Sequence, residues 1–93
     1  MQSSEYQKII EALLFTSPEP LTQARVNGVF DQEAPNLKEV VTELNDLYEK
    51  EDHAFEIKQI AGGYQLVSRP EYEHFIRRLL NKSGRLALSS AAL

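Results

Sequence analysis

Apolar residues recur at the spacing of one helix face near the start of the chain. This stripe predicts an amphipathic helix over residues 4–15, and its members are Tyr6, Ile9, Ile10, Leu13 and Leu14. Either Ser3 or Ser4 can cap the helix at its N-terminus. The segment "TSPEPLT" must end the helix, because its two prolines cannot continue a helical backbone. Pro20 and Leu21 are therefore expected to be extended, as a short strand.

Two further helical stretches follow this break. Thr22 suits the N-cap of a short second helix, whose inner face is predicted to be Val26, Val29 and Phe30. Asn36 and Glu39 have the N-cap and N3 spacing of a capping box, which begins a third helix that extends to about Glu51. The apolar face of the third helix follows the i, i+3, i+4 rule and comprises Leu37, Val40, Val41, Leu44, Leu47 and Tyr48.

The apolar period changes to two at Phe55, which is typical of a strand. Gly62 and Gly63 are predicted to form a two-residue turn between two antiparallel strands. The pairs that this turn implies are Ala61 with Tyr64, Gln59 with Leu66 and Ile57 with Ser68. The predicted core side comprises Phe55, Ile57, Ala61, Tyr64 and Leu66. On the outer side the predicted pairs are Glu56 with Arg69, Lys58 with Val67 and Ile60 with Gln65.

A last helix is predicted after Arg69, because Pro70 suits the first position of a helix. Its apolar stripe comprises Tyr72, Phe75, Ile76, Leu79 and Leu80, and "NKSG" is expected to end it. The order helix, short strand, helix, helix, strand, strand, helix predicts an α+β fold, a winged helix with an appended C-terminal helix. This domain is assigned to residues 1–81, and residues 82–93 are assigned to a linker and the start of a further segment.

Composition limits the chemistry that the chain can perform. Its 93 residues suffice for one domain, and the absence of cysteine excludes disulfides, thiolate nucleophiles and thiolate metal ligands. His53 and His74 have no metal-ligand spacing and are interpreted as solvated surface residues. Ser89 and Ser90 have no nucleophile-elbow motif around them. We therefore predict a cytoplasmic protein with no catalytic residue, cofactor, metal or membrane span.

The net charge of −4 is distributed unevenly along the chain. Residues 1–74 carry fourteen acidic and six basic side chains, whereas residues 75–93 carry four basic ones and no acidic one. The helix dipole favours cations in the last turn of a helix and is the preferred interpretation of Arg77, Arg78 and Lys82; contact with nucleic acid is the alternative. In the helix-turn-helix class the third helix reads DNA, but residues 37–52 here carry six acidic and two basic side chains and repel phosphate.

Three apolar positions are unexpected on a solvated surface. Phe15 lies opposite the stripe of the first helix, and Ile60 and Val67 are predicted to be diagonal neighbours on the outer side of the hairpin. Apolar side chains that gather on a surface are typical of docking sites. These residues favour a protein-binding module, and a DNA-binding winged-helix transcriptional regulator is the alternative.

Several segments, taken in order, resemble one known family. The segments "IIEALLFTSPEPLT", "VVTELNDLYEKEDHAFEIKQIAGGYQLVSRPEY" and "LSSAAL" are together similar to the bacterial segregation and condensation protein B family, over essentially the whole chain. The most specific parts are "EALLF" followed by "EPL", and "GGYQL" leading into "RPEY". The resemblance implies two consecutive winged-helix domains, of which this chain is the first, with "LSSAAL" at the start of a truncated second.

The resemblance also implies a function without catalysis. Members of this family are structural subunits of the SMC–kleisin condensin complex and act in chromosome condensation and segregation, associated with the nucleoid through the complex. The resemblance implies a homodimer, formed mainly by the first domain, that binds the central region of the kleisin subunit ScpA and takes no small-molecule substrate. The family signature carries over no contact residue. The physical candidates for the protein interface are Phe15, Ile60, Val67, Tyr72, Phe75, Ile76, Leu79 and Leu80.

Overall fold

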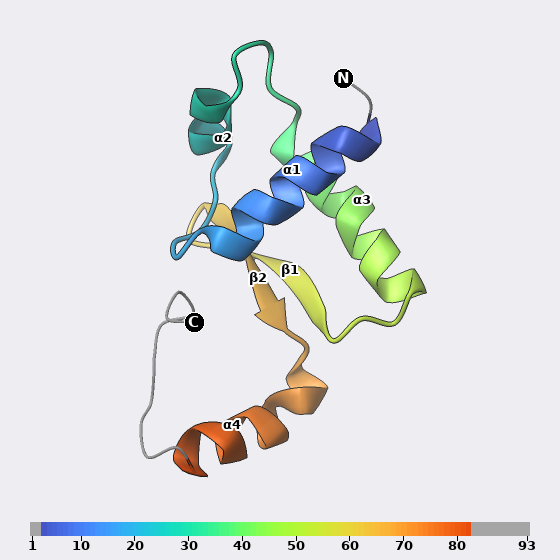
Figure 1. Cartoon of the computed structure of the whole chain (residues 1–93), viewed down its shortest axis with the longest axis vertical. Helices are drawn as coiled ribbons and strands as arrows, with labels where there is room; N and C mark the ends of the chain where they lie inside the picture. Colours follow the sequence, from blue (N-terminus) through green and yellow to red (C-terminus); the bar gives the residue numbers. More distant parts are fainter. Residues whose placement is uncertain (1–2, 83–93) are drawn as a thin grey trace.

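The structure is a computed structural model that describes residues 3–82 of the chain. Its elements in chain order are α1 (Ser3–Thr16), α2 (Gln23–Val29), α3 (Leu37–Lys50), β1 (Phe55–Ile60), β2 (Gly63–Ser68), a 3₁₀ turn (Pro70–Tyr72) and α4 (Glu73–Lys82) (Figure 1). An isolated bridge between Leu21 and Tyr64 adds a short third strand to the β1–β2 hairpin. This arrangement confirms the predicted α+β winged helix with an appended helix. The linker and second-domain start were predicted at residues 82–93; Lys82 is the last residue of α4 instead, and residues 83–93 lie outside the described residues.

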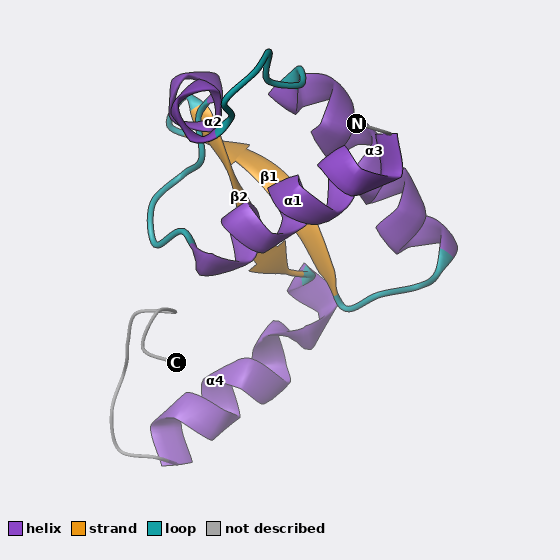
Figure 2. Cartoon of the chain, turned by 45° about the horizontal axis from the view of Figure 1, so that its top comes forward, coloured by secondary structure: helices purple, strands orange, loops and turns teal. Residues whose placement is uncertain are grey.

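One hydrophobic core lies between α1, α2, α3 and one side of the hairpin, and Figure 2 shows how these elements are arranged. Its buried side chains are Ile10, Leu14, Leu21, Val26, Leu37, Val40, Val41, Leu44, Tyr48 and Ile57. Burial stabilises each large apolar side chain by about 1.5–3 kcal/mol relative to exposure. Phe55, Tyr64 and Leu66 pack against this cluster from the hairpin, on the side that the sequence predicted.

The starts of α2 and α3 are fixed by the capping side chains that the sequence indicated. Thr22 Oγ1 accepts a hydrogen bond from the Arg25 backbone N–H at 3.2 Å. Asn36 Oδ1 accepts one from the Glu39 backbone N–H at 3.1 Å. Both bonds satisfy donors of the first helical turn, which have no partner within the helix. The two predicted caps are therefore confirmed.

Val29 and Leu47 were predicted on inner helix faces but are exposed. Val29 is 55% exposed, because α2 ends at this residue and of its apolar side chains only Val26 is buried. Leu47 is 39% exposed at the edge of the α3 stripe, where Leu44 and Tyr48 already fill the side toward the core. All other members of the predicted α3 stripe are buried.

The turn of the hairpin lies one residue earlier than the sequence predicted. Its central residues are Ala61 and Gly62, with positive φ angles of 50° and 80° that suit a tight hairpin turn. The observed pairs are Phe55 with Ser68, Glu56 with Val67, Ile57 with Leu66, Lys58 with Gln65, Gln59 with Tyr64 and Ile60 with Gly63. The predicted pairs are therefore wrong by two positions. The other core-side residues stay on the predicted side of the hairpin, because side chains alternate between the two sides of a strand and the shift is two positions. Only Ala61 leaves that side, since it lies in the turn.

The outer side of the hairpin differs from the prediction as a result. Glu56 lies opposite Val67 rather than opposite Arg69. The backbone N–H of Arg69 bonds instead to the carbonyl of Ala54, at 2.9 Å. Val67 pairs with Glu56, whereas Ile60 lies four residues further along β1, beside the turn. Ile60 and Val67 are therefore not the diagonal neighbours that the sequence predicted.

Gly63 is required by the short third strand rather than by the turn. The Leu21 N–H donates to the Tyr64 carbonyl at 2.8 Å, and the Tyr64 N–H donates to the Leu21 carbonyl at 2.9 Å. This bridge confirms the extended segment that was predicted at Pro20 and Leu21. A Cβ on Gly63 would lie 2.8 Å from the Leu21 carbonyl oxygen, which is closer than a carbon and an oxygen can approach. The close approach of the two strands therefore depends on glycine.

The last helix, α4, lies apart from the rest of the domain. Pro70 occupies the first position of the 3₁₀ turn, as predicted, and this turn leads directly into α4. Figure 1 shows that α4 projects away from α1, α3 and the hairpin. Every residue from 70 to 81 is exposed. The helix therefore adds nothing to the core described above.

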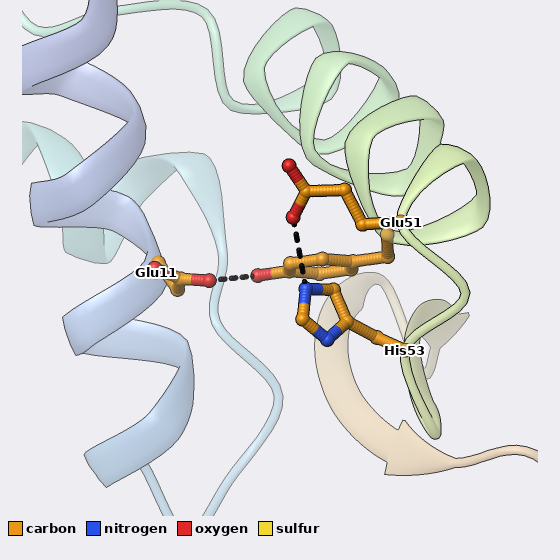
Figure 3. Close-up of polar contacts among 4 residues, drawn as sticks. Glu11, Glu51 and His53 are labelled. Atoms are coloured by element: carbon orange, nitrogen blue, oxygen red, sulfur yellow. Dashed lines mark hydrogen bonds and ion pairs between the residues drawn. The ribbon is translucent and has the colours of Figure 1, made fainter.

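Tyr48 connects α3 to α1 through a buried hydroxyl group. The residue is 2% exposed, and its hydroxyl donates to Glu11 Oε2 at 2.5 Å (Figure 3). Burial, and next the hydrogen bond and the charge of Glu11, raise the pKa of Tyr48 above its ordinary value of about 10. Phe55 packs its ring against the ring of Tyr48 with centroids 4.9 Å apart. Tyr48 thus joins both helices to the hairpin.

Replacing Tyr48 by phenylalanine is expected to make the stability of the protein depend less steeply on pH in the alkaline range. Because the pKa of Tyr48 is raised in the folded protein, the hydroxyl contributes its full stabilisation below about pH 10. This stabilisation is lost as the pH rises further. At neutral pH the variant should be less stable by about 1.5–3 kcal/mol, the value of a hydrogen bond to a charged group. Urea unfolding at a series of pH values measures both effects. Parallel stability curves for the two proteins would contradict this role of the hydroxyl.

Candidate protein-binding surfaces

An exposed apolar surface covers one side of α4 and the 3₁₀ turn before it. We call this surface the α4 face, and its members are Tyr72 (38% exposed), Phe75 (67%), Ile76 (36%), Leu79 (67%) and Leu80 (38%). They are the whole stripe that the sequence predicted for this helix. An apolar stripe on a helix normally packs against another element. The residues of this stripe keep between 36% and 67% of their surface exposed, and another molecule can contact that surface.

The charged side of α4 is held by contacts within the helix. Arg77 Nη2 lies 2.6 Å from Glu73 Oε2, one turn earlier, and both side chains are well exposed. Exposed pairs of this spacing contribute about 0.3–0.5 kcal/mol. This pair gives Arg77 a partner within the helix, whereas the dipole interaction predicted for Arg77, Arg78 and Lys82 stays a prediction.

A second apolar feature is a groove between the end of α1 and β2, which we call the Phe15 groove. It has a volume of about 550 Å³ and is lined by Leu14, Phe15, Thr16, Ser17, Ala54, Phe55, Gln65, Leu66, Val67 and Ser68. None of these side chains carries a charge, although 26% of the residues in the chain are charged. Phe15 is 75% exposed and leaves its ring open to a partner.

The predicted interface residues lie in three places. Phe15 and Val67 line the same groove, Ile60 lies beside the hairpin turn, and the other five form the α4 face. Leu66 and Phe55 were not predicted as groove residues, because their strand period predicted only that they face the core. Both are half-buried and do pack against the core. No pattern in the sequence shows where two elements leave a gap between them.

The exposed side of α3 is acidic. The charged residues of segment 37–52 are all exposed, and they are Lys38, Glu39, Glu43, Asp46, Glu49, Lys50, Glu51 and Asp52. Glu43 accepts a hydrogen bond from the Gln7 amide at 3.0 Å. In helix-turn-helix proteins the corresponding helix enters the major groove of DNA. A surface with three times as many acidic as basic side chains repels the phosphate backbone instead.

The two histidines differ in their surroundings. The His53 side chain is 40% exposed but is not freely solvated as predicted, because its ring stacks on Phe55 with centroids 5.0 Å apart. His53 Nε2 also lies 3.2 Å from Glu51 Oε1 (Figure 3). His74 is exposed, as predicted. Within residues 3–82, no group of three or more His, Asp or Glu side chains is placed to hold a metal ion.

The described part of the chain contains no helix that combines the length and the apolar character needed to cross a membrane.

The fold and its surfaces define a winged-helix domain with an acidic third helix and an exposed apolar C-terminal helix. The family described as "Segregation and condensation complex subunit ScpB" matches residues 8–93. The chain therefore belongs to the ScpB family.

Known proteins of similar sequence and fold agree with this assignment. Segregation and condensation protein B of Symbiobacterium thermophilum is 40% identical to the chain over 85 residues, which are 91% of the chain and 38% of that relative. A conserved hypothetical protein from Chlorobium tepidum has a crystal structure with a TM-score of 0.75 and 34% identity, over 85% of the chain and 50% of that protein. The chain thus spans half or less of the length of these relatives.

A third similar structure is a dimer. It is the crystal structure of a dimer of an ScpB N-terminal domain complexed with an ScpA peptide. Its TM-score is 0.69 at 23% identity, over 82% of the chain and 95% of that domain. At this identity the likeness establishes a shared fold. The described fold therefore corresponds to nearly the whole of that N-terminal domain.

Proposed function

We propose that this chain is the dimer-forming, kleisin-binding part of an ScpB subunit, which acts as a structural component in chromosome condensation and segregation without catalysis. The single observation that carries the proposal is the α4 face, a complete apolar helix stripe that is left exposed on an otherwise packed domain. Exposed apolar surface of this kind is typical of protein interfaces. The proposal places the protein in the cytoplasm, at the nucleoid through the complex.

A second copy of the chain suits the α4 face. The helix has ten residues, and isolated helices shorter than about 12–15 residues are marginal in water. Packing against a partner would supply the missing stabilisation. In a twofold dimer both chains contribute the same face, so the interface contains two apolar stripes, one from each chain. The dimer of an ScpB N-terminal domain with the same fold supports this partner.

The kleisin subunit ScpA is the second proposed partner, and SMC is reached through it. Membership of the ScpB family and the ScpA peptide bound to the related N-terminal domain support this partner. The Phe15 groove offers an apolar surface formed by α1 and the hairpin, whereas the α4 face belongs to the last helix. One copy can therefore contact a second copy and a kleisin chain at the same time. The acidic side of α3 disfavours the alternative of a DNA-binding regulator.

Sedimentation and co-purification test this proposal together. The 93-residue chain is expected to sediment as a dimer and to retain the central region of the kleisin subunit from the same organism. Duplex DNA, added in the same buffers, should bind weakly and without a steep dependence on salt, because few phosphates are contacted. A protein extended to the full length of its relatives is the control for kleisin sites that lie elsewhere. A monomer that retains duplex DNA but no kleisin would support the regulator instead.

A further inference from the structure

The hairpin has two outer edges, and part of each is already covered. On β1, the Ile57 N–H donates to Asn45 Oδ1 at 2.9 Å, and Asn45 Nδ2 donates to the Ile57 carbonyl at 3.0 Å. On β2, Tyr64 exchanges two hydrogen bonds with Leu21, at 2.8 and 2.9 Å. The backbone groups of Ile57 and Tyr64 therefore point outward, away from the partner strand.

The next outward positions on β2 have no such cover. Successive residues of a strand point their N–H and C=O groups in alternate directions. Since Tyr64 points outward, Leu66 and Ser68 point to the same edge, and neither has a hydrogen-bond partner there among residues 3–82. The short third strand at Leu21 does not extend along β2 to Leu66 and Ser68. The two residues before Leu21 cannot continue the pairing, because Pro20 has no N–H to donate and the Glu19 carbonyl already accepts a hydrogen bond from a serine hydroxyl at 2.6 Å.

This open edge lies in the Phe15 groove. Leu66 and Ser68 line the groove from β2, and the last turn of α1, with Phe15, lines it from the opposite side. Open strand edges bind extended chains by adding a strand, in which the backbone gives affinity and alternate side chains enter pockets. The edge therefore has both the hydrogen-bonding groups and the apolar pocket that strand addition uses.

We propose that the β2 edge at Leu66 and Ser68 binds an extended, uncharged peptide segment of a partner chain by strand addition. An apolar side chain of the peptide packs against Phe15 in the groove. The inference rests on the proposed function, in which the partner is the kleisin subunit. It adds the place where the kleisin binds and the conformation in which it does so.

An extended peptide fits this groove better than a second copy of the chain. The α4 helix of a second copy cannot pair with β2, because its backbone groups already bond within the helix. A second hairpin needs room for two strands at a spacing of about 4.8 Å, and the last turn of α1 bounds the groove opposite β2. The uncharged lining disfavours a charged side chain in the groove, since an unpaired buried charge is costly.

Backbone hydrogen exchange tests the proposal directly. The probes are overlapping synthetic peptides that cover the central region of the kleisin subunit from the same organism, added to the 93-residue chain. A peptide that binds is expected to slow exchange at the Leu66 and Ser68 N–H groups by about tenfold or more. Gln65 and Val67 are the internal control, because their N–H groups already face β1 and should change much less.

Chemical changes in the peptide and the groove provide a second test. N-methylation removes a backbone donor, so methyl groups at alternate peptide positions should weaken binding by about tenfold, while those between them should not. Phe15→Asp should weaken binding by a similar factor, because it places a charge in an uncharged groove. Val29→Asp, on α2 and outside the groove, is the matched control and should bind normally. Both positions are exposed, so both variants should fold.

The outcomes separate this inference from the proposed function. Protection at Leu66 together with the alternating methylation pattern supports strand addition. Peptide binding without protection at Leu66, or binding that Phe15→Asp leaves unchanged, overturns strand addition while kleisin binding stands. Failure of the peptides and of the whole kleisin central region to bind overturns both. A shift from dimer to monomer in Phe15→Asp would show that a second copy occupies the groove.

Discussion

Replacing Gly63 by alanine is expected to lower the free energy of unfolding by about 2–4 kcal/mol. The new Cβ would lie 2.8 Å from the Leu21 carbonyl oxygen and 3.0 Å from the Pro20 Cβ. The first contact is with backbone, which cannot rotate away, so the short third strand must move off β2. That movement costs the two hydrogen bonds between Leu21 and Tyr64. Urea unfolding measures the loss, at one fixed protein concentration because dimers gain stability with concentration.

Two other glycines are matched controls for this substitution. An added Cβ on Gly28 in α2 would meet nothing within 4 Å, so Gly28→Ala is expected to stabilise the protein by about 0.5–1 kcal/mol. Gly62 also has open space around it, but its φ of 80° costs an L-residue about 1–2 kcal/mol. Gly63→Ala should therefore be the most damaging of the three. Equal losses for Gly62→Ala and Gly63→Ala would attribute the effect to the turn rather than to Leu21.

The same pair of glycines explains why the hairpin was predicted correctly but its register was not. Two adjacent glycines between strands normally indicate the two central turn residues. Here only Gly62 lies in the turn, and Ala61 takes the other position with a φ of 50°. Gly63 is reserved for the contact with Leu21, which lies about forty residues earlier in the chain. A contact between segments so distant leaves no local pattern for a sequence analysis to find.

The third helix was the most predictable element, because local and tertiary requirements agree there. Its cap at Asn36 and its stripe both follow from residues within one segment, and both are confirmed except for the stripe member Leu47. Leu47 shows the limit of that reasoning. A period of 3.6 residues locates the centre of a buried face, but the width of that face depends on what packs against it. With α1 and the hairpin in place, the edge of the stripe remains 39% exposed.

The two surfaces of the candidate site differ in how far the sequence could predict them. All five residues of the α4 face were selected from helical spacing alone, although spacing did not show that the domain itself leaves them uncovered. The Phe15 groove depends on the gap between α1 and β2, so only its members Phe15 and Val67 were selected, each for a separate reason. The open edge at Leu66 follows from the register, which the sequence did not determine.

Substituting Phe75 by aspartate is expected to weaken the proposed dimer by a factor of about 100 or more. Burying a phenylalanine side chain contributes about 1.5–3 kcal/mol, and a twofold dimer contains each residue twice, so about 3–6 kcal/mol is lost. A factor of ten in the dissociation constant corresponds to about 1.4 kcal/mol. Phe75 is 67% exposed within one chain, so the substitution removes no contact that the folded domain requires. Sedimentation equilibrium over a series of concentrations measures the change.

Matched variants separate the α4 face from exposed apolar surface in general. Leu79→Asp, one turn further along the face and also 67% exposed, should weaken the dimer similarly. Val29→Asp replaces a 55% exposed apolar side chain on α2 and should leave the dimer intact. If both α4 variants remained dimeric at the concentrations where the wild type is dimeric, the copies would meet through a different surface.

Dimerisation and the helicity of α4 should also change together. A ten-residue helix whose apolar side is exposed is marginal in water on its own. Monomeric Phe75→Asp is therefore expected to lose part of the helical circular-dichroism signal, and diluting the wild type below its dissociation constant should produce a similar loss. Val29→Asp should show neither change. Since α1 and α3 are held by the core, a loss confined to the dissociated protein would identify α4 as the helix that the partner stabilises.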